Sequence, residues 1–131
     1  MSTLNHDIMS IFIQNFTDDA RIIYRHNNII DTKIMEDLNI VVSDKLSDVI
    51  LYDTTKNWLY LIDTVLHHGS MNTKRIKQLK SLLHNNSSKV LFITAYPNKN
   101  IFSDYVMDIS WNTIAWIESE PGHIIHFNGN I

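Results

Sequence analysis

Two aspartates, Asp48 and Asp63, stand among apolar residues in the segment 47–69, SDVILYDTTKNWLYLIDTVLHHG. Residues 48–53 and 57–65 are rich in β-branched and aromatic side chains and flank a short polar turn, so the segment predicts a β-hairpin. Each aspartate lies near the outer end of its strand. A hairpin that brings two carboxylates together can bind a cation, and a bound cation can assist hydrolysis.

The register of this hairpin decides where the two carboxylates lie. An even-numbered loop centred between Thr55 and Lys56 predicts three cross-strand pairs: Thr54 with Asn57, Tyr52 with Leu59, and Ile50 with Leu61. The same register places Asp48 opposite Asp63 on one side of the sheet, with Cβ atoms about 4.5–5.5 Å apart. An odd-numbered loop would offset the two acids.

Two carboxylates that face each other repel, so they require water, a retained proton or a cation between them. Mg²⁺ suits such a pair because one or two carboxylates hold it, and its other positions stay open to water and phosphate oxygens. The alternative is a pair of hydrated strand-end aspartates beside loops, where aspartate is common. Spacing alone leaves both interpretations open.

Cationic side chains follow the hairpin in residues 72–85, NTKRIKQLKSLLHN, whose apolar residues on one face predict a helix. Lys74 falls in the first turn, close to the end of the second strand, and Lys77 shares its helix face. If the strand continues, Val65 lies on the face of Asp63 and offers no cation there. The alternative for these lysines is a solvated helix face.

Two adjacent histidines, His67 and His68, precede Gly69 at a predicted turn. Adjacent histidines in such a loop rarely bind one ion together, and no nearby residue has zinc-like spacing, so the sequence does not predict a zinc site. We expect loop hydrogen bonding or a phosphate contact for His68 and packing for His67. We likewise expect the aromatic residues that fall inside predicted elements to pack in the core rather than stack on bases; they are Trp58, Trp111, Trp116, Tyr105 and Phe127.

The rest of the chain predicts helices around a mixed sheet. The apolar run at 89–96 is nearly continuous, which indicates a strand buried on both faces and covered by helices on both sides. The predicted helices are 3–16, 31–39, 72–85 and 98–109, and the predicted strands are 21–25, 48–53, 57–65, 89–96, 113–119 and 123–129. This order favours a three-layer α/β domain.

Composition is that of an ordinary globular protein. The 131 residues suffice for a single domain, taken as 1–131, and 44% of them are hydrophobic. No apolar run reaches the roughly 20 residues that cross a bilayer, and no secretory signal precedes the first helix, so we expect no membrane association. The absence of cysteine favours a cytoplasmic location. With a formal net charge of -3, any polyanion must meet a local basic patch or a bound cation.

Several short motifs together resemble a known family. They are Asp48-Val49 with Leu51-Tyr52-Asp53, Asn57-Trp58-Leu59, His68-Gly69 with Lys74-Arg75, Thr94-Ala95 with Pro97, and His126-Phe127-Asn128-Gly129. Over residues 47–129 the chain resembles the catalytic domain of the BsuBI/PstI family of type II restriction endonucleases, within the PD-(D/E)XK nuclease superfamily. The resemblance implies a restriction-endonuclease-like fold, with a central mixed β-sheet flanked by helices.

The resemblance also implies roles for individual residues. Asp48 matches the aspartate of the superfamily's PD pair and Asp63 matches its second acid, so both would bind Mg²⁺, with the backbone carbonyl of Thr64 as a third ligand. Mn²⁺ is expected to substitute, and no organic cofactor is expected. Because Val65 stands where the superfamily usually has lysine, Lys74 is the catalytic candidate that orients the attacking water or stabilises charge on the phosphate. Candidates for nucleic-acid contact are His68, Arg75 and Lys77.

The chain departs from the family pattern at several points. Ser47 stands where the family has proline, Asp63 where it usually has glutamate, and Ser70 where it usually has proline. Family members also carry an additional N-terminal region linked to DNA recognition, and the chain is expected to lack it.

The resemblance implies a Mg²⁺-dependent endonuclease in which a metal-activated water attacks DNA phosphodiester bonds. Because cutting both strands needs two active sites, it implies a homodimer or a separate specificity subunit. Two alternatives stay open. One is a nuclease-fold module that binds nucleic acid or protein without catalysis, and the other is a nuclease that acts on RNA or on branched or damaged DNA.

Overall fold

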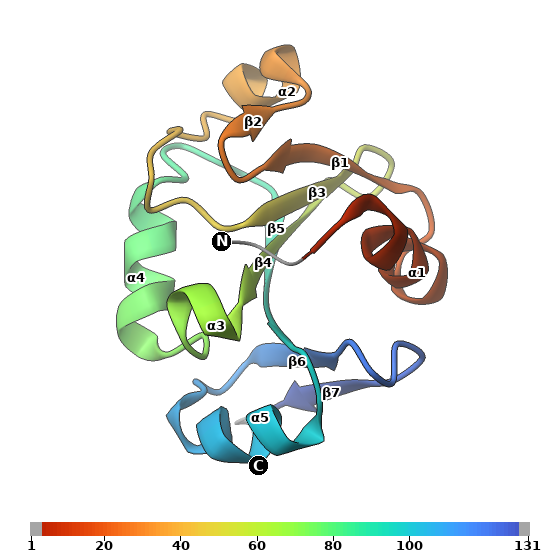
Figure 1. The fold of residues 1–131 in the computed structure, drawn as a ribbon. Helices are drawn as coiled ribbons and strands as arrows, with labels where there is room; N and C mark the ends of the chain where they lie inside the picture. Colours follow the sequence, from red (N-terminus) through yellow and green to blue (C-terminus); the bar gives the residue numbers. More distant parts are fainter. Residues whose placement is uncertain (1–3, 129–131) are drawn as a thin grey trace.

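The structure, a computed structural model, describes residues 4–128 apart from the side chain of His6. The outermost positions of the first predicted helix and the last predicted strand, 3 and 129, lie outside the described residues. Seven strands form one sheet in the order β2-β1-β3-β4-β5-β6-β7 (Figure 1). The strands are β1 (Ala20–Arg25), β2 (Asn28–Ile29), β3 (Val49–Asp53), β4 (Trp58–Thr64), β5 (Lys89–Tyr96), β6 (Thr113–Ile117) and β7 (Ile124–Phe127).

The sheet is mixed, as predicted. β4 pairs with β5 in parallel and β5 pairs with β6 in parallel, whereas the other neighbours pair antiparallel. Parallel neighbours need long crossovers, which here contain helices. The helices are α1 (His6–Phe16), α2 (Thr32–Asp37), α3 (Val65–His68), α4 (Thr73–Ser81) and α5 (Lys99–Tyr105), with a 3₁₀ turn, η1 (Val106–Asp108), after α5.

Helices cover both faces of the sheet, which confirms the three-layer prediction. Val49 and Leu51 pack in one buried cluster with Phe12 of α1. Ile50, between them in sequence, packs in a second cluster with Leu79 of α4, because side chains alternate along a strand. In Figure 1, α1 and α4 accordingly lie on opposite sides of the sheet.

Polar caps begin the longer helices. The side chain that precedes each of α1, α2, α4 and α5 accepts a hydrogen bond from the backbone N–H three residues later; the capping residues are Asn5, Asp31, Asn72 and Asn98. The apolar pattern predicted a helix over residues 72–85, but α4 ends at Ser81. The short strand β2 escaped prediction, since two exposed residues carry no alternation.

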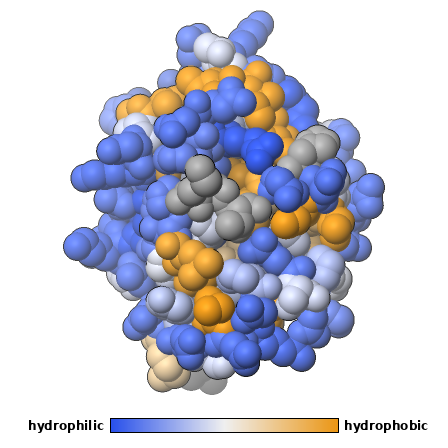
Figure 2. Space-filling view, in the orientation of Figure 1, coloured by the Kyte–Doolittle hydropathy of each residue, from blue (hydrophilic) through white to orange (hydrophobic). Residues whose placement is uncertain are grey.

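The surface is mostly polar. Figure 2 shows that hydrophilic residues cover most of this face and that hydrophobic residues form separate patches among them. Tyr105 and Trp111 contradict the sequence-based prediction of core packing, since they are 37% and 65% exposed, whereas Trp116 is buried. Trp111 is the more exposed of the two. It lies in a turn before β6 rather than inside an element, so no neighbouring layer covers it. Within residues 4–128, no helix has both the length and the apolar character that crossing a membrane requires.

Candidate active site

Asp48 and Asp63 lie where the β3–β4 hairpin ends. The observed pairs of Ile50 with Leu61 and of Tyr52 with Leu59 confirm the predicted register. One more step along the two antiparallel strands sets Asp48 opposite Asp63, on the same face of the sheet as α4. Both aspartates are completely buried. The sheet therefore holds two carboxylates beside each other away from bulk water.

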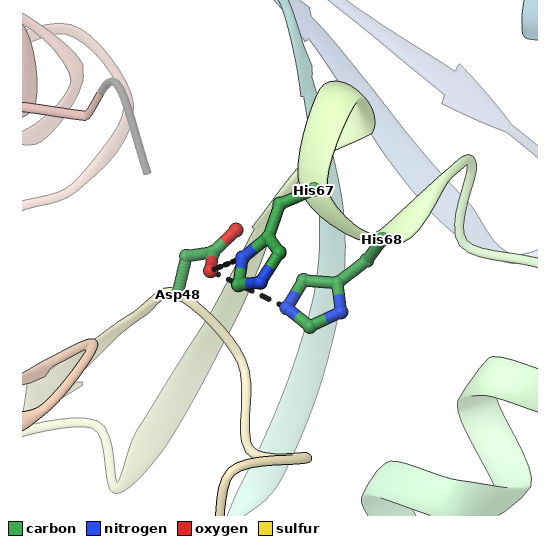
Figure 3. Close-up of side chains that lie close together, drawn as sticks. All are labelled: Asp48, His67 and His68. Atoms are coloured by element: carbon green, nitrogen blue, oxygen red, sulfur yellow. Dashed lines mark hydrogen bonds and ion pairs between the residues drawn. The ribbon is translucent and has the colours of Figure 1, made fainter. Parts of the chain in front are cut away.

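The carboxylate of Asp48 has different partners at its two oxygens. Oδ2 accepts hydrogen bonds from the backbone N–H and the hydroxyl of Thr64, each at 2.8 Å. Oδ1 lies 2.5 Å from Nδ1 of His67 and 3.3 Å from Nε2 of His68 (Figure 3). Burial acts to raise the pKa of Asp48, but its contacts with His68, Thr64 and His67 together hold the pKa well below its usual range. Asp48 is therefore ionised.

The carboxylate of Asp63 is held by a guanidinium group. Arg75 Nε donates to Oδ2 at 2.6 Å and Nη2 donates to Oδ1 at 3.0 Å, so the pair is bidentate. The remaining Nη1 donates to the backbone carbonyl of Lys45 at 2.6 Å and to Oε1 of Gln78 at 2.5 Å. Only 6% of Arg75 is exposed. Both charges of this pair are thus buried and fully bonded, as a buried ion pair requires.

Loop contacts position the helices that supply these partners. α3 begins directly after β4 and ends at Gly69, whose φ of 75° suits glycine. Met71 N–H donates to the hydroxyl of Thr94 at 2.9 Å, which ties the following loop to β5. Ser70 bonds the hydroxyl of Tyr96 at 2.8 Å from the same loop. The loop between α3 and α4 is therefore fixed to the neighbouring strand of the sheet.

The structure separates the predicted cations. Arg75 points into the site, one residue after Lys74, which is exposed and has no hydrogen bond or ion pair within residues 4–128. Val65 does not extend the strand face of Asp63, because it begins α3. Lys77 is exposed on α4 and lines a groove of about 590 Å³ together with Trp111 and other residues.

The histidines were partly misjudged from sequence. His67 was expected to pack, but it contacts the Asp48 carboxylate. His68 was expected to form loop hydrogen bonds or to contact a phosphate. It is the last residue of α3, and its buried Nε2 lies 3.3 Å from Asp48 Oδ1. The missed signal was positional: both histidines follow a strand whose partner strand carries a buried acid at the same end.

The site fits a divalent cation. Oδ1 of Asp48 lies 3.3 Å from Nε2 of His68, a buried nitrogen that forms no hydrogen bond of good geometry among the described residues. A cation bound between the two atoms would satisfy both of them. Asp63 Oδ1 is 4.0 Å from the same nitrogen, so both carboxylates border one small region. Each carboxylate oxygen has a second lone pair, so Asp63 can accept another partner beside Arg75.

Comparisons with known proteins agree with the fold and the hairpin motifs. A family model described as the BsuBI/PstI restriction endonuclease domain matches residues 1–130. The type II restriction enzyme BsuBI of Bacillus subtilis is 32% identical over 135 residues, which cover 98% of this chain and 43% of that enzyme. The type II restriction enzyme AplI of Arthrospira platensis is 31% identical over 126 residues, which cover 92% of this chain and 38% of that enzyme.

A solved structure shares the fold. The SdaI restriction endonuclease superimposes with a TM-score of 0.82 at 22% identity, over 95% of this chain and 41% of that one. The chain thus spans less than half the length of each of these three proteins.

Proposed function

Because this chain belongs to the BsuBI/PstI restriction endonuclease family, we propose that it is an endonuclease that hydrolyses DNA phosphodiester bonds with a divalent cation. The observation that carries this proposal is the buried pair of acids, Asp48 and Asp63, on one face of the sheet at the end of the central hairpin. An acid pair with a bordering imidazole nitrogen is suited to binding a cation and a phosphate together.

The cation that fits the family chemistry is Mg²⁺, with Mn²⁺ as a substitute. Asp48 and Asp63 would hold it, with the backbone carbonyl of Thr64 as a third ligand. When bound, it would activate a water and neutralise charge on the phosphate. The role of the chain is to keep Asp48 ionised through the amide and hydroxyl of Thr64, and to keep both carboxylates in place within the sheet.

Cations near the acids are the candidates for phosphate contact. Lys74 is exposed in the first turn of α4, where it can reach a phosphate that approaches from solvent. Arg75 would assist by its charge, while it stays bonded to Asp63. His68 faces both acids, and Lys77 lies by the groove that Trp111 shares, where an exposed ring can contact a nucleotide.

The assembly that acts on DNA is also part of the proposal. Two sites are needed to cut both strands, so we place the chain in a homodimer or beside a specificity subunit. Such a protein would work in the cytoplasm, without membrane or organic cofactor.

Plasmid cleavage tests the proposal. Purified protein is incubated with supercoiled plasmid and Mg²⁺ or Mn²⁺, beside Asp48→Ala and Asp63→Asn, with Asp104→Ala as the control because Asp104 is an exposed acid on α5. We expect both site variants to lose activity by about 100-fold or more, the scale of losing one electrostatic contact in an active site. Circular dichroism verifies folding. Equal activity of the wild type and Asp48→Ala would contradict the proposal.

One observation favours a second candidate, a nuclease-fold module that binds nucleic acid without cutting it. Both oxygens of Asp63 are bonded to Arg75, so the second acid is less available than the first. This candidate predicts DNA binding without cleavage in either metal. RNA and branched DNA in the same assay separate it from a nuclease with another substrate.

A further inference from the structure

Three potential metal ligands from two separate segments converge at one point. Asp48, His67 and His68 each offer one ligand atom, and these three atoms all lie within 4.8 Å of one another. Figure 3 shows both imidazole rings turning a nitrogen toward the same carboxylate. The two rings lie side by side, with centroids 4.0 Å apart and planes inclined by 36°. We call these three residues the Asp48–histidine cluster.

Hydrogen bonding within the protein accounts for only part of this arrangement. Oδ2 of Asp48 is already engaged by Thr64, so both imidazole nitrogens approach the other oxygen. His67 Nδ1 bonds that oxygen, whereas the buried His68 Nε2 lies 3.3 Å from it and forms no hydrogen bond of good geometry among the described residues. A buried polar atom without a partner is costly unless another group completes it. A cation among the three ligand atoms completes it.

The ligand types select a class of ion. Mg²⁺ prefers oxygen ligands and keeps several waters, whereas imidazole nitrogen suits first-row transition ions. Two imidazoles and one carboxylate leave further coordination positions open to water or substrate, as in sites where three protein ligands hold a catalytic ion.

The neighbouring charges favour Asp48 over Asp63 as the acid that binds the ion. Asp63 is less available to this ligand group than Asp48, because Arg75 bonds both its oxygens. The positive charge of Arg75 is therefore neutralised by Asp63 rather than directed at an incoming cation. Asp48, whose own side-chain contacts are hydroxyl and imidazole groups, is left to attract the ion.

We propose that the Asp48–histidine cluster binds a first-row transition ion such as Mn²⁺, Co²⁺ or Zn²⁺, with both imidazoles as ligands. This inference rests on the proposed function only in placing a cation at Asp48. It deepens that function, because it adds two imidazole nitrogens to the ligands around Asp48 and names the class of ion that these nitrogens favour, Mn²⁺ among them.

Mn²⁺ binding without DNA tests the inference. The loss of the free Mn²⁺ electron paramagnetic resonance signal measures binding to the wild type, His67→Gln, His68→Gln and the control His123→Gln. His123 is exposed and far along the chain from the cluster. We expect one ion per chain and an affinity at least about tenfold weaker in His67→Gln and His68→Gln, as for loss of a metal-site contact. The control should match the wild type, and Mg²⁺ in roughly 100-fold excess should fail to displace Mn²⁺.

A second measurement needs no substitution, so misfolded variants cannot obscure the result. Electron spin-echo modulation of the bound Mn²⁺ should show coupled ¹⁴N, and labelling histidine with ¹⁵N should change the pattern. Absence of stoichiometric Mn²⁺, unchanged affinity in both histidine variants, or modulation that is insensitive to the label would overturn the inference. Bound Mn²⁺ with coupled nitrogen in a protein that cuts no DNA would support the inference and contradict the proposed function.

Discussion

The two carboxylates of the central hairpin are equally buried, but their surroundings differ in kind. Asp48 is bonded by an amide, a hydroxyl and imidazole nitrogens, and imidazole can exchange a proton for a metal. Asp63 is bonded by the guanidinium of Arg75, whose planar fork of N–H groups matches a carboxylate. The sheet sets where both acids lie, whereas the few residues after β4 decide what each acid can bind. Asp48 therefore has partners that a cation can replace, whereas Asp63 keeps the guanidinium of Arg75.

Substitution of Asp63 should have the largest effect on stability. Asp63→Ala leaves the guanidinium of Arg75 buried without its carboxylate, so we expect the free energy of unfolding to fall by about 3–5 kcal/mol. Urea unfolding followed by circular dichroism measures the change.

A paired substitution is the control for this effect. Asp63→Leu with Arg75→Met replaces both charges by apolar groups, which for buried pairs is often neutral or stabilising. The double variant should therefore be more stable than Asp63→Ala. A loss below about 1 kcal/mol in Asp63→Ala would show that water reaches the pair and would remove the contrast between the two acids.

Substitution of Asp48 should have an intermediate effect on stability, and that effect should depend on pH. Its folded pKa lies below the usual value of 3.8, so ionised Asp48 stabilises the fold above that pH, and the stabilisation is lost as the pH falls through the folded pKa. In a metal chelator near pH 6, we expect Asp48→Asn to be less stable than the wild type by about 1–3 kcal/mol, the scale of a hydrogen bond to a charged group. Urea unfolding at a series of pH values below 3.8 should show this gap narrowing. A gap that stays constant with pH would mean that the charge of Asp48 contributes nothing.

A half-buried acid, Glu118, should show the smallest effect. Burial raises the pKa of Glu118, and its Oε2 has no hydrogen-bond partner among the described residues. An acid with a raised folded pKa costs stability as the pH rises past its usual value of 4.5. Near pH 7, Glu118→Gln should therefore gain a few tenths of a kcal/mol, as small substitutions away from the core do. Thermal unfolding measures the change.

Its control is Glu120→Gln, because Glu120 is paired with Lys99 at 3.0 Å. That variant should gain nothing. A stability gain of the same size in both variants would point to net charge rather than to burial.

Much of the fold and part of the site followed from sequence patterns. The hairpin register was predictable once the loop was taken as even-numbered and centred between Thr55 and Lys56, because that loop pairs Ile50 with Leu61 and sets the positions of both acids. The three layers were predictable because the apolar run in β5 indicated burial on both faces.

The partners of the acids could not be predicted, because they depend on where an element ends. β4 stops at Thr64, so Val65 turns into α3 instead of continuing the strand, and His67 is carried back to Asp48. Arg75 rather than Lys74 meets an acid, because one residue rotates a helical side chain by about 100°. Local sequence propensity predicts neither the residue at which β4 ends nor the angle at which α4 packs on the sheet.

Among residues 4–128, the side chains that hydrogen-bond or ion-pair with either carboxylate lie within residues 48–75, a single uninterrupted segment. The entropy lost on closing a loop grows with the logarithm of the loop length. These contacts close short loops, so each loses somewhat less chain entropy than a pairing between strands that are distant in sequence. Loops elsewhere, such as 118–123 between β6 and β7, can lengthen without changing the distance from one acid to its partners. The chemistry of this domain is thus insulated from variation at its periphery.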